Sequence, residues 1–299
     1  MPEITDPYQG IGLVYLVWAP LGPQPVREFL NSYQANSPGI EHGLTIVLNG
    51  AAHAARPRSG KTSLRTSRKG HACDASAALT RKDLLTELAG IEHRLLVLDR
   101  PVLDLAAYGL AARMLENQRL CFLNSYSVVL VDNWLSLLSR PLEEPSVGLA
   151  GATASWESQA EWVRGRARYW PYQLATLRGA RRDYPRFPNP HIRTTAFAIE
   201  REILLGMGLE RATDKRSTYL LESGHDSLTR QVQTSGLRVV ITGRDGNIYE
   251  ADRWGAAGTY RSGEQKNLLV ADRRTRDWQR ASPRLQRRLS HDAWGTSDI

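Results

Sequence analysis

The chain has 299 residues, of which 41% are hydrophobic, and a formal net charge of +8. This length and apolar content predict a soluble globule with a buried core, large enough for one large or two ordinary domains. Its apolar runs, such as LVYLVWAP from Leu13, are too short to cross a bilayer. With only Cys73 and Cys121, the chain has no disulfide framework or cysteine metal cluster, which favours a reducing cytoplasmic setting.

The positive charge is unevenly distributed along the chain. Basic residues gather in residues 56–69, in residues 178–186 and in a tail over residues 273–288. Such clusters favour anionic partners, which include the phosphates of a nucleotide, nucleic acid and an anionic membrane surface. Zinc-finger spacing, an RNA-recognition pattern and leucine heptads are all absent from the sequence. We therefore expect no nucleic-acid partner, and we leave open a peripheral contact of the basic tail with a membrane.

Short apolar strands alternate with helical stretches through the first half, which predicts an α/β sheet with crossover helices. The predicted strands cover residues 13–19, 44–49, 94–98, 119–123 and 147–152, and a later strand covers residues 237–243. Ligands of such sheets bind beyond the carboxyl ends of the strands. We therefore expect the functional residues directly after these strands.

Helical spacing of apolar residues appears in three stretches between the strands. The stretch 26–34 places Val26, Phe29 and Leu30 on one face, and a third helix is predicted over residues 132–138. The second helix begins at Asp104, as an N-cap, and turns Tyr108 inward. These helices are expected to cover the sheet.

A basic polar insertion occupies residues 51–78. It contains ARPRSGKTS, from Ala55 to Ser63, which fits a loose phosphate-loop pattern. A working phosphate loop needs a helix that starts at its Lys-Thr, and the sequence after Thr62 has no apolar face that a helix would bury. Pro57 also removes a backbone donor from the cradle. We interpret the segment as a basic, flexible insertion.

The segment RLCFLNSYS, residues 119–127, is an apolar strand that ends in the polar cluster Asn124, Ser125 and Tyr126. Together with the order of the strands, it resembles the glycosyltransferases of the GT-A fold, family 2. In these enzymes the corresponding strand ends Phe-Leu-Asp-x-Asp, and both carboxylates hold a divalent metal against the donor diphosphate. The resemblance covers residues 13–243. It implies a mixed Rossmann-like sheet flanked by helices in a single domain, residues 1–250, followed by a polar and basic extension, residues 251–299.

Both metal-binding carboxylates are absent here, since Asn124 and Tyr126 stand in their positions. Magnesium and manganese bind largely through carboxylates, so a divalent metal cofactor is disfavoured, although a metal held by Asp99 or Asp226 stays open. Arginines would then stabilise the charge of the leaving diphosphate. The alternative for Asn124 and Ser125 is a simple turn at the strand end.

A second segment, LLESGHDSLTRQVQTSGLRVVI over residues 220–241, resembles the family 2 block that carries the general base. In that block an acidic pair precedes a Leu and a helical Arg, whereas here the pair is split into Glu222 and Asp226. Glu222 precedes a Ser-Gly turn and is the preferred base. Asp226, in the first turn of a helix that starts near Ser223, is second because such a position favours any negative charge. His225 is third.

A third segment, PRFPNPHIRTTAFAIERE over residues 185–202, resembles the acceptor side of these transferases. Its prolines predict an extended loop before a short apolar strand. The resemblance implies that His191 and Arg193 face the donor phosphates or the acceptor, and that Asn189 binds a hydroxyl. A structural role for His191 is the alternative.

The nucleotide side of the resemblance begins at Pro20, after the first strand. Family 2 enzymes commonly place an Asp after the second strand to bind the base, and Asn49 stands there in this chain. Asp99 follows the third strand. With Asn124, Ser125 and Tyr126, these residues form the predicted donor site.

The resemblance implies an inverting transfer of a sugar from a nucleotide-sugar donor to an acceptor hydroxyl. The acceptor would be a glycan or lipid-linked molecule in bacterial-type cell-surface polysaccharide or glycolipid assembly. Two alternatives stay open: a basic module that binds nucleic acid or an anionic surface, and a transferase-like protein without catalytic activity.

Overall fold

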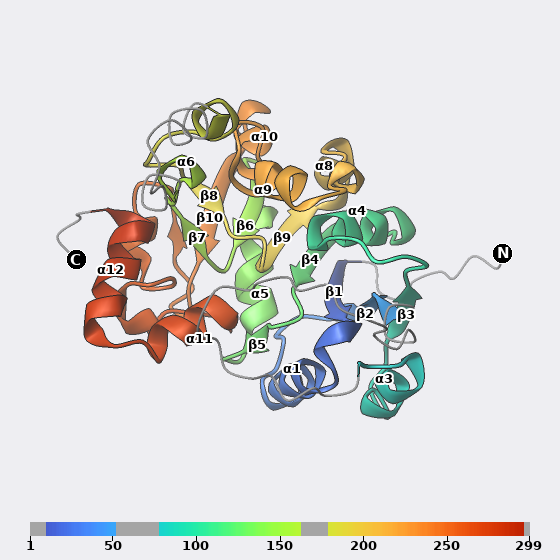
Figure 1. Cartoon of the computed structure of the whole chain (residues 1–299). Helices are drawn as coiled ribbons and strands as arrows, with labels where there is room; N and C mark the ends of the chain where they lie inside the picture. The colour runs from blue at the N-terminus through green and yellow to red at the C-terminus, as the bar shows by residue number, and fades with distance from the viewer. Residues whose placement is uncertain (1–9, 52–77, 163–178, 296–299) are drawn as a thin grey trace, which may run out of the picture.

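The computed structural model describes residues 10–51, 78–162 and 179–295, and a sheet of eight strands forms its centre (Figure 1). The strand order is β11–β10–β6–β9–β4–β1–β2–β3. All the strands that the sequence predicts are present. The strands of this sheet are β1 (Ile11–Trp18), β2 (His42–Asn49), β3 (Arg94–Val97), β4 (Arg119–Leu123), β6 (Val147–Gly151), β9 (Ala196–Glu200), β10 (Arg238–Thr242) and β11 (Ile248–Tyr249).

The sheet is mixed because β9 runs against its two neighbours. Strand β1 is parallel to β2 and β4, and β10 is parallel to β6, whereas β9 pairs antiparallel with both β4 and β6. Leu123, at the end of β4, lies opposite Ala196, at the start of β9. The segment that enters β9 therefore reaches the edge of the sheet at which β1, β4 and β6 end.

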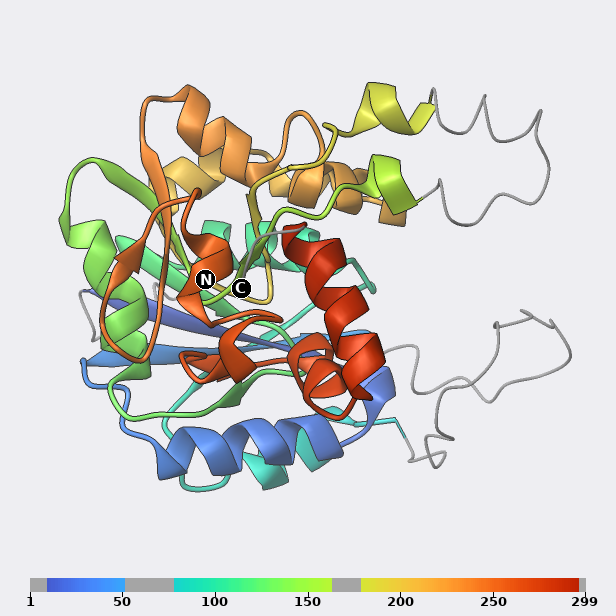
Figure 2. The same cartoon turned by 90° about the vertical axis from the view of Figure 1, so that its left-hand side faces the viewer.

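Helices cover both faces of the sheet (Figures 1 and 2). Along β1, Leu13 and Tyr15 pack in one apolar core, and Val14 and Leu16 pack in the other. Burial on both faces explains why the strands are continuous apolar runs. The first core contains residues of α1 (Gln24–Ala35), α3 (Arg81–Glu87) and α5 (Trp134–Ser139), and the second contains residues of α4 (Asp104–Met114), α8 (Arg201–Gly206) and α10 (Leu228–Thr234). This is the mixed sheet flanked by helices that the GT-A resemblance implies.

Two predicted helix starts differ from the structure. Leu103 is the N-cap of α4 and Asp104 is its first residue, without a side-chain capping bond. The prediction of a helix start near Ser223 is wrong, because α9 (Lys215–Ser223) ends there and α10 begins at Leu228. Gly224 closes α9 through its N–H, which donates to the carbonyl of Leu220. Asp226 thus precedes α10 rather than lying in its first turn.

Residues 251–295 share an apolar core with the sheet and its helices. Trp254, Tyr260 and Trp294 are buried in the same core as α4, and β12 (Val270–Ala271) pairs with β5 (Val128–Val129). The segment continues through α11 (Arg273–Gln279) and α12 (Pro283–Trp294). Within the described residues, no helix is long and apolar enough to cross a membrane. The phosphate-loop pattern, at residues 55–63, lies outside the described residues.

Candidate active site

Asn124, Ser125 and Tyr126 form a tight turn at the end of β4. The Oδ1 atom of Asn124 accepts hydrogen bonds from the backbone N–H of Tyr126 at 3.0 Å and from the hydroxyl of Ser127 at 3.2 Å. Ser125 is buried, and its hydroxyl oxygen accepts a bond from the backbone N–H of Trp18 at 3.0 Å. Asn commonly closes turns in this way. The side chains of Asn124 and Ser125 therefore fix the connection between β4 and the end of β1.

This turn does not fit a divalent cation. The oxygen of Asn124 is neutral and already accepts two hydrogen bonds, and no carboxylate belongs to the turn. Magnesium and manganese need charged oxygen ligands. In the described ranges, no group of three or more His, Cys, Asp and Glu side chains is placed to hold a metal. The residues of this turn therefore offer no charged ligand for a divalent metal.

Glu222 lies in the last turn of α9, half-buried, near the end of β4. Its Oε1 atom accepts a 3.1 Å hydrogen bond from the hydroxyl of Thr194, and the carbonyl of Thr195 accepts a 3.0 Å bond from the N–H of Asn124. Two adjacent threonines thus connect Glu222 with the turn after β4. Asp226 and His225 are exposed in the loop between α9 and α10.

A small polar pocket brings Glu222 together with residues from distant parts of the chain. Three predicted residues, Glu222, His191 and Arg193, line it. Two further lining residues, Glu157 and Arg274, were not predicted from the sequence. They come from the loop after β7 (Ala154–Ser155) and from α11. The full lining is Glu157, Ser158, Gln159, His191, Arg193, Glu222, Ser223 and Arg274.

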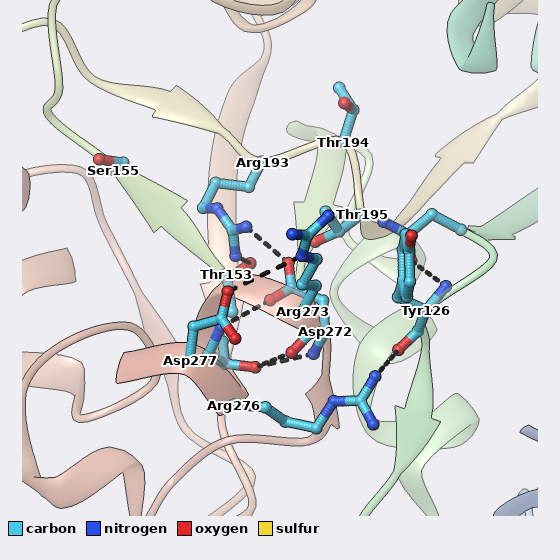
Figure 3. A network of polar contacts seen from close by, with 12 residues as sticks. Tyr126, Thr153, Ser155, Arg193, Thr194, Thr195, Asp272, Arg273, Arg276 and Asp277 are labelled. Carbon is cyan, nitrogen blue, oxygen red and sulfur yellow. Dashed lines mark hydrogen bonds and ion pairs between the residues drawn. The ribbon is translucent and has the colours of Figure 1, made fainter. Parts of the chain in front are cut away.

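Arg193 is buried and its charge is neutralised by Asp272, which accepts an ion-paired hydrogen bond of 2.5 Å (Figure 3). The guanidinium also donates to the hydroxyl of Thr153 at 3.2 Å and lies 4.1 Å from the ring centroid of Tyr260. Burial opposes the charge on Arg193, but the Asp272 carboxylate outweighs it, so the pKa of Arg193 is above its usual value. Arg193 therefore acts as a support of the pocket wall rather than as a free cation.

A second buried ion pair flanks Tyr260. Arg261 donates to Glu157 at 2.8 Å, and its guanidinium lies 4.8 Å from the Tyr260 ring. The hydroxyl of Ser155 also donates to Glu157 at 3.2 Å. The paired residues are 104 positions apart in the chain, and Arg193 and Asp272 are 79 apart. No local sequence pattern could have joined them.

Asn189 and His191 hold the pocket wall together. The buried Asn189 amide donates to the carbonyl of Ser223 at 2.8 Å, which ties the segment before β9 to the end of α9. Nδ1 of His191 lies 2.8 Å from the carbonyl of Asn189, so Nδ1 carries the proton of the neutral ring. Burial lowers the pKa of His191. This effect is larger than the opposite effect of the Asn189 carbonyl and the Glu222 carboxylate, which raise the pKa. His191 is thus neutral at pH 7.

Two adjacent arginines at the start of α11 face two parts of the site. The guanidinium of Arg273 lies 5.9 Å from the ring centroid of Tyr126, at the turn after β4 (Figure 3). Its ion pair with Asp277 is long, at 3.8 Å, and both side chains are exposed. Arg274 lines the pocket with Glu222 and forms no ion pair with the described residues. No feature of the basic tail distinguished these two arginines in the sequence.

Asp104 is a further carboxylate that the sequence analysis did not connect with the site. Its side chain reaches solvent at the start of α4, but the neighbouring protein limits its hydration. These surroundings and the nearby Glu222 carboxylate raise the pKa of Asp104. Asp104 and Glu222 belong to two helices that are in contact, α4 and α9.

The predicted nucleotide residues occupy different environments. Pro20 is exposed in a short 3-10 turn after β1. Asn49 is fully buried and binds both backbone groups of Val102, as donor at 2.8 Å and as acceptor at 3.1 Å. Asp99 is exposed and lines a separate cavity of about 1010 Å³ beside β3 and α4. In this structure Asn49 thus links the end of β2 to the loop before α4.

Comparisons with known proteins give structural similarity alone. No protein-family model and no curated protein sequence matches the chain. A mannosyltransferase from Pyrobaculum calidifontis, in complex with GDP-Man and Mn²⁺, is 14% identical with a TM-score of 0.43, and the match covers 85% of this chain and 64% of that one. A glucosyl-3-phosphoglycerate synthase from Mycobacterium tuberculosis, in complex with Mn²⁺, UDP and phosphoglyceric acid, is 13% identical with a TM-score of 0.35 and coverages of 65% and 57%. The chain spans less than two thirds of the length of both proteins.

Proposed function

We propose that the protein is a GT-A glycosyltransferase that moves a sugar from a nucleotide-sugar donor to an acceptor hydroxyl. The observation that carries the proposal is the position of Glu222. This carboxylate is held by Thr194 at the edge where β1, β4 and β6 end, inside a polar pocket. Ligands of α/β sheets bind at this edge.

Glu222 would act as the general base of the transfer. It accepts the proton of the acceptor hydroxyl while the hydroxyl oxygen attacks the anomeric carbon and the bond to the diphosphate breaks. The enzyme supplies no nucleophile, so the single displacement inverts the configuration at the anomeric carbon. Thr194 holds one carboxylate oxygen, which orients Glu222 for this proton transfer.

Arg273 would stabilise the negative charge that develops on the leaving diphosphate. It is exposed beside Tyr126, at the turn where the family 2 enzymes hold a metal, and its ion pair with Asp277 is long. Arginine stays charged at all relevant pH values and grips phosphate through two parallel hydrogen bonds. Positive charge fixed at this position lowers the barrier to departure of the diphosphate.

The acceptor belongs, in this proposal, to cell-surface polysaccharide or glycolipid assembly at the cytoplasmic side of a membrane. Helix α12 exposes Arg284, Arg287 and Arg288 together with Leu285, a combination that suits a peripheral contact with anionic lipid. Sedimentation with vesicles tests this contact. Equal binding to vesicles with and without phosphatidylglycerol would count against it.

Thermal stabilisation by UDP, GDP, CMP and dTDP sugars tests the central proposal, because a ligand that prefers the native state raises its apparent stability. We expect one nucleotide class to stabilise the protein and its sugar to be transferred when an acceptor extract is added. No stabilisation by any class, with salt-sensitive binding to polyanions, would favour the basic binding module instead. Donor binding without transfer by any extract would favour an inactive relative.

A further inference from the structure

Arg274 is exposed and lines the pocket of Glu222, and among the described residues no ion pair neutralises its charge. The other ionic residues of the pocket wall are paired, Arg193 with Asp272 and Glu157 with Arg261. Burial keeps His191 neutral. Glu222 and Arg274 are therefore the two charged side chains of the described lining without a buried ion-pair partner.

The pocket is also narrow. Its enclosed space is about 20 Å³, room for roughly one water-sized group such as a hydroxyl, so a sugar ring does not enter it. The lining is rich in polar groups, with Ser158, Gln159 and the side chains named above. An acceptor that places its hydroxyl in the pocket can bring a negatively charged group to the exposed Arg274, and it gains affinity there because the charge-assisted hydrogen bonds of arginine to carboxylate or phosphate are strong.

We infer that Arg274 binds an anionic group, a carboxylate or a phosphate, of the acceptor. The inference rests on the proposed function, since Glu222 must touch the acceptor hydroxyl and Arg274 shares its pocket. The donor diphosphate belongs instead at the turn of Tyr126, where Arg273 lies. In this arrangement Arg273 binds the donor diphosphate and the adjacent Arg274 binds the anionic group of the acceptor. The acceptor is therefore a hydroxylated acid or a phosphate ester.

Labelling with phenylglyoxal tests the inference on the full chain. The reagent modifies accessible arginines, and mass spectrometry of peptides reads the rate at each position. Four additives are compared. Glucose is a neutral sugar, glucuronate carries a carboxylate, glucose 6-phosphate carries a phosphate, and UDP carries the diphosphate of a donor. Glucuronate or glucose 6-phosphate should slow the labelling of Arg274 about fivefold or more when its concentration exceeds its Kd several-fold, while glucose has no effect. Arg280, exposed at the end of the same helix, is the internal control.

Equal labelling of Arg274 with all four additives would overturn the inference, and so would protection by UDP alone, which would assign Arg274 to the donor. These readouts need no turnover, so they stand even if the proposed transfer fails. Once a donor is known, Arg274→Ala should raise KM for a charged acceptor about tenfold or more and leave KM for a neutral one unchanged. Arg280→Ala should change neither. Equal KM values for the charged acceptor in wild type and Arg274→Ala would overturn the inference while leaving glycosyl transfer intact.

Discussion

The hydroxyl of Thr194 donates a 3.1 Å hydrogen bond to Oε1 of Glu222 and thereby ties the end of α9 to the segment that enters β9. A second bond between the same segments, from the Asn189 amide to the Ser223 carbonyl at 2.8 Å, restricts them further. A carboxylate held in this way keeps a fixed orientation towards the pocket, which is what a general base needs.

Glu222→Gln should abolish most turnover while donor binding persists. Glutamine keeps the shape of the side chain and can still accept a hydrogen bond from Thr194, but it cannot take the proton. The rate of sugar transfer should fall about a hundredfold or more. Transfer rates, together with thermal shifts by the donor, check this expectation.

The matched control for this variant is Asp226→Asn. Asp226 is exposed in the loop before α10, so its loss should change the rate less than about twofold. An inactive but folded Asp226→Asn protein beside an active Glu222→Gln protein would move the base to Asp226.

Removal of divalent metal should reduce activity little, and Arg273→Ala should reduce it strongly. The turn of Asn124 supplies no charged ligand for a metal, so positive charge for the diphosphate must come from elsewhere. Loss of Arg273 should lower kcat about a hundredfold, the order of effect seen when one preorganised group is removed. Transfer assays with EDTA, with added manganese and with Arg280→Ala as control measure both effects. Strict dependence on manganese would refute the metal-free mechanism.

Asp272→Asn should destabilise the fold by about 3 kcal/mol or more, because it leaves the buried Arg193 charge without a partner. Asparagine can still cap α11, so the loss isolates the ion pair. Denaturation by urea measures the change. Asp277→Asn, at an exposed position of the same helix, should cost at most about 0.5 kcal/mol. Adding Arg193→Met to Asp272→Asn should recover part of the stability, and a double variant weaker than the single one would contradict this account.

His191 should make the fold less stable in mild acid. Burial lowers its pKa in the folded protein, so the unfolded chain binds a proton more readily than the native one. The contribution of His191 is thus fully present above its unfolded pKa of about 6.5 and is lost as the pH falls towards the lower folded pKa. His191→Gln should flatten the decline of the unfolding free energy between about pH 7 and pH 5. His225→Gln, at an exposed position, should leave that decline unchanged, and identical curves for wild type and His191→Gln would contradict the assignment.

The central strands were predictable because both of their faces are buried, so they appear in the sequence as short apolar runs. The edge strand β3 is only partly buried, but its run of Leu95, Leu96 and Val97 marks it as well. Glu222 was also within reach, since a Ser-Gly pair follows it and marks the end of a structural element. The predicted type of element was wrong, because Gly224 closes the helix that precedes it, whereas a helix start was expected there.

The other half of the site could not be predicted. Glu157 and Arg261 meet across 104 residues of sequence, and such contacts depend on how the C-terminal segment folds back onto the sheet. Arg274 is one of many arginines in a basic tail, and only its position in the fold gives it a pocket. Asp104 has the typical sequence context of an N-cap, so its nearness to Glu222 had no local signal.

Asp272 has consequences for how this chain can be divided or recombined. Its Oδ1 accepts a 2.8 Å bond from the N–H of Thr275 and so caps α11, while its Oδ2 pairs with Arg193. One carboxylate therefore joins the helix that carries Arg273 and Arg274 to the segment before β9. A shortened chain that stops at residue 250 would remove both the counter-charge of Arg193 and the Tyr260 ring that packs on it. A chimera would keep this ion pair only if the parent of its residues 185–200 supplied Arg193 and the parent of its residues 260–280 supplied Asp272.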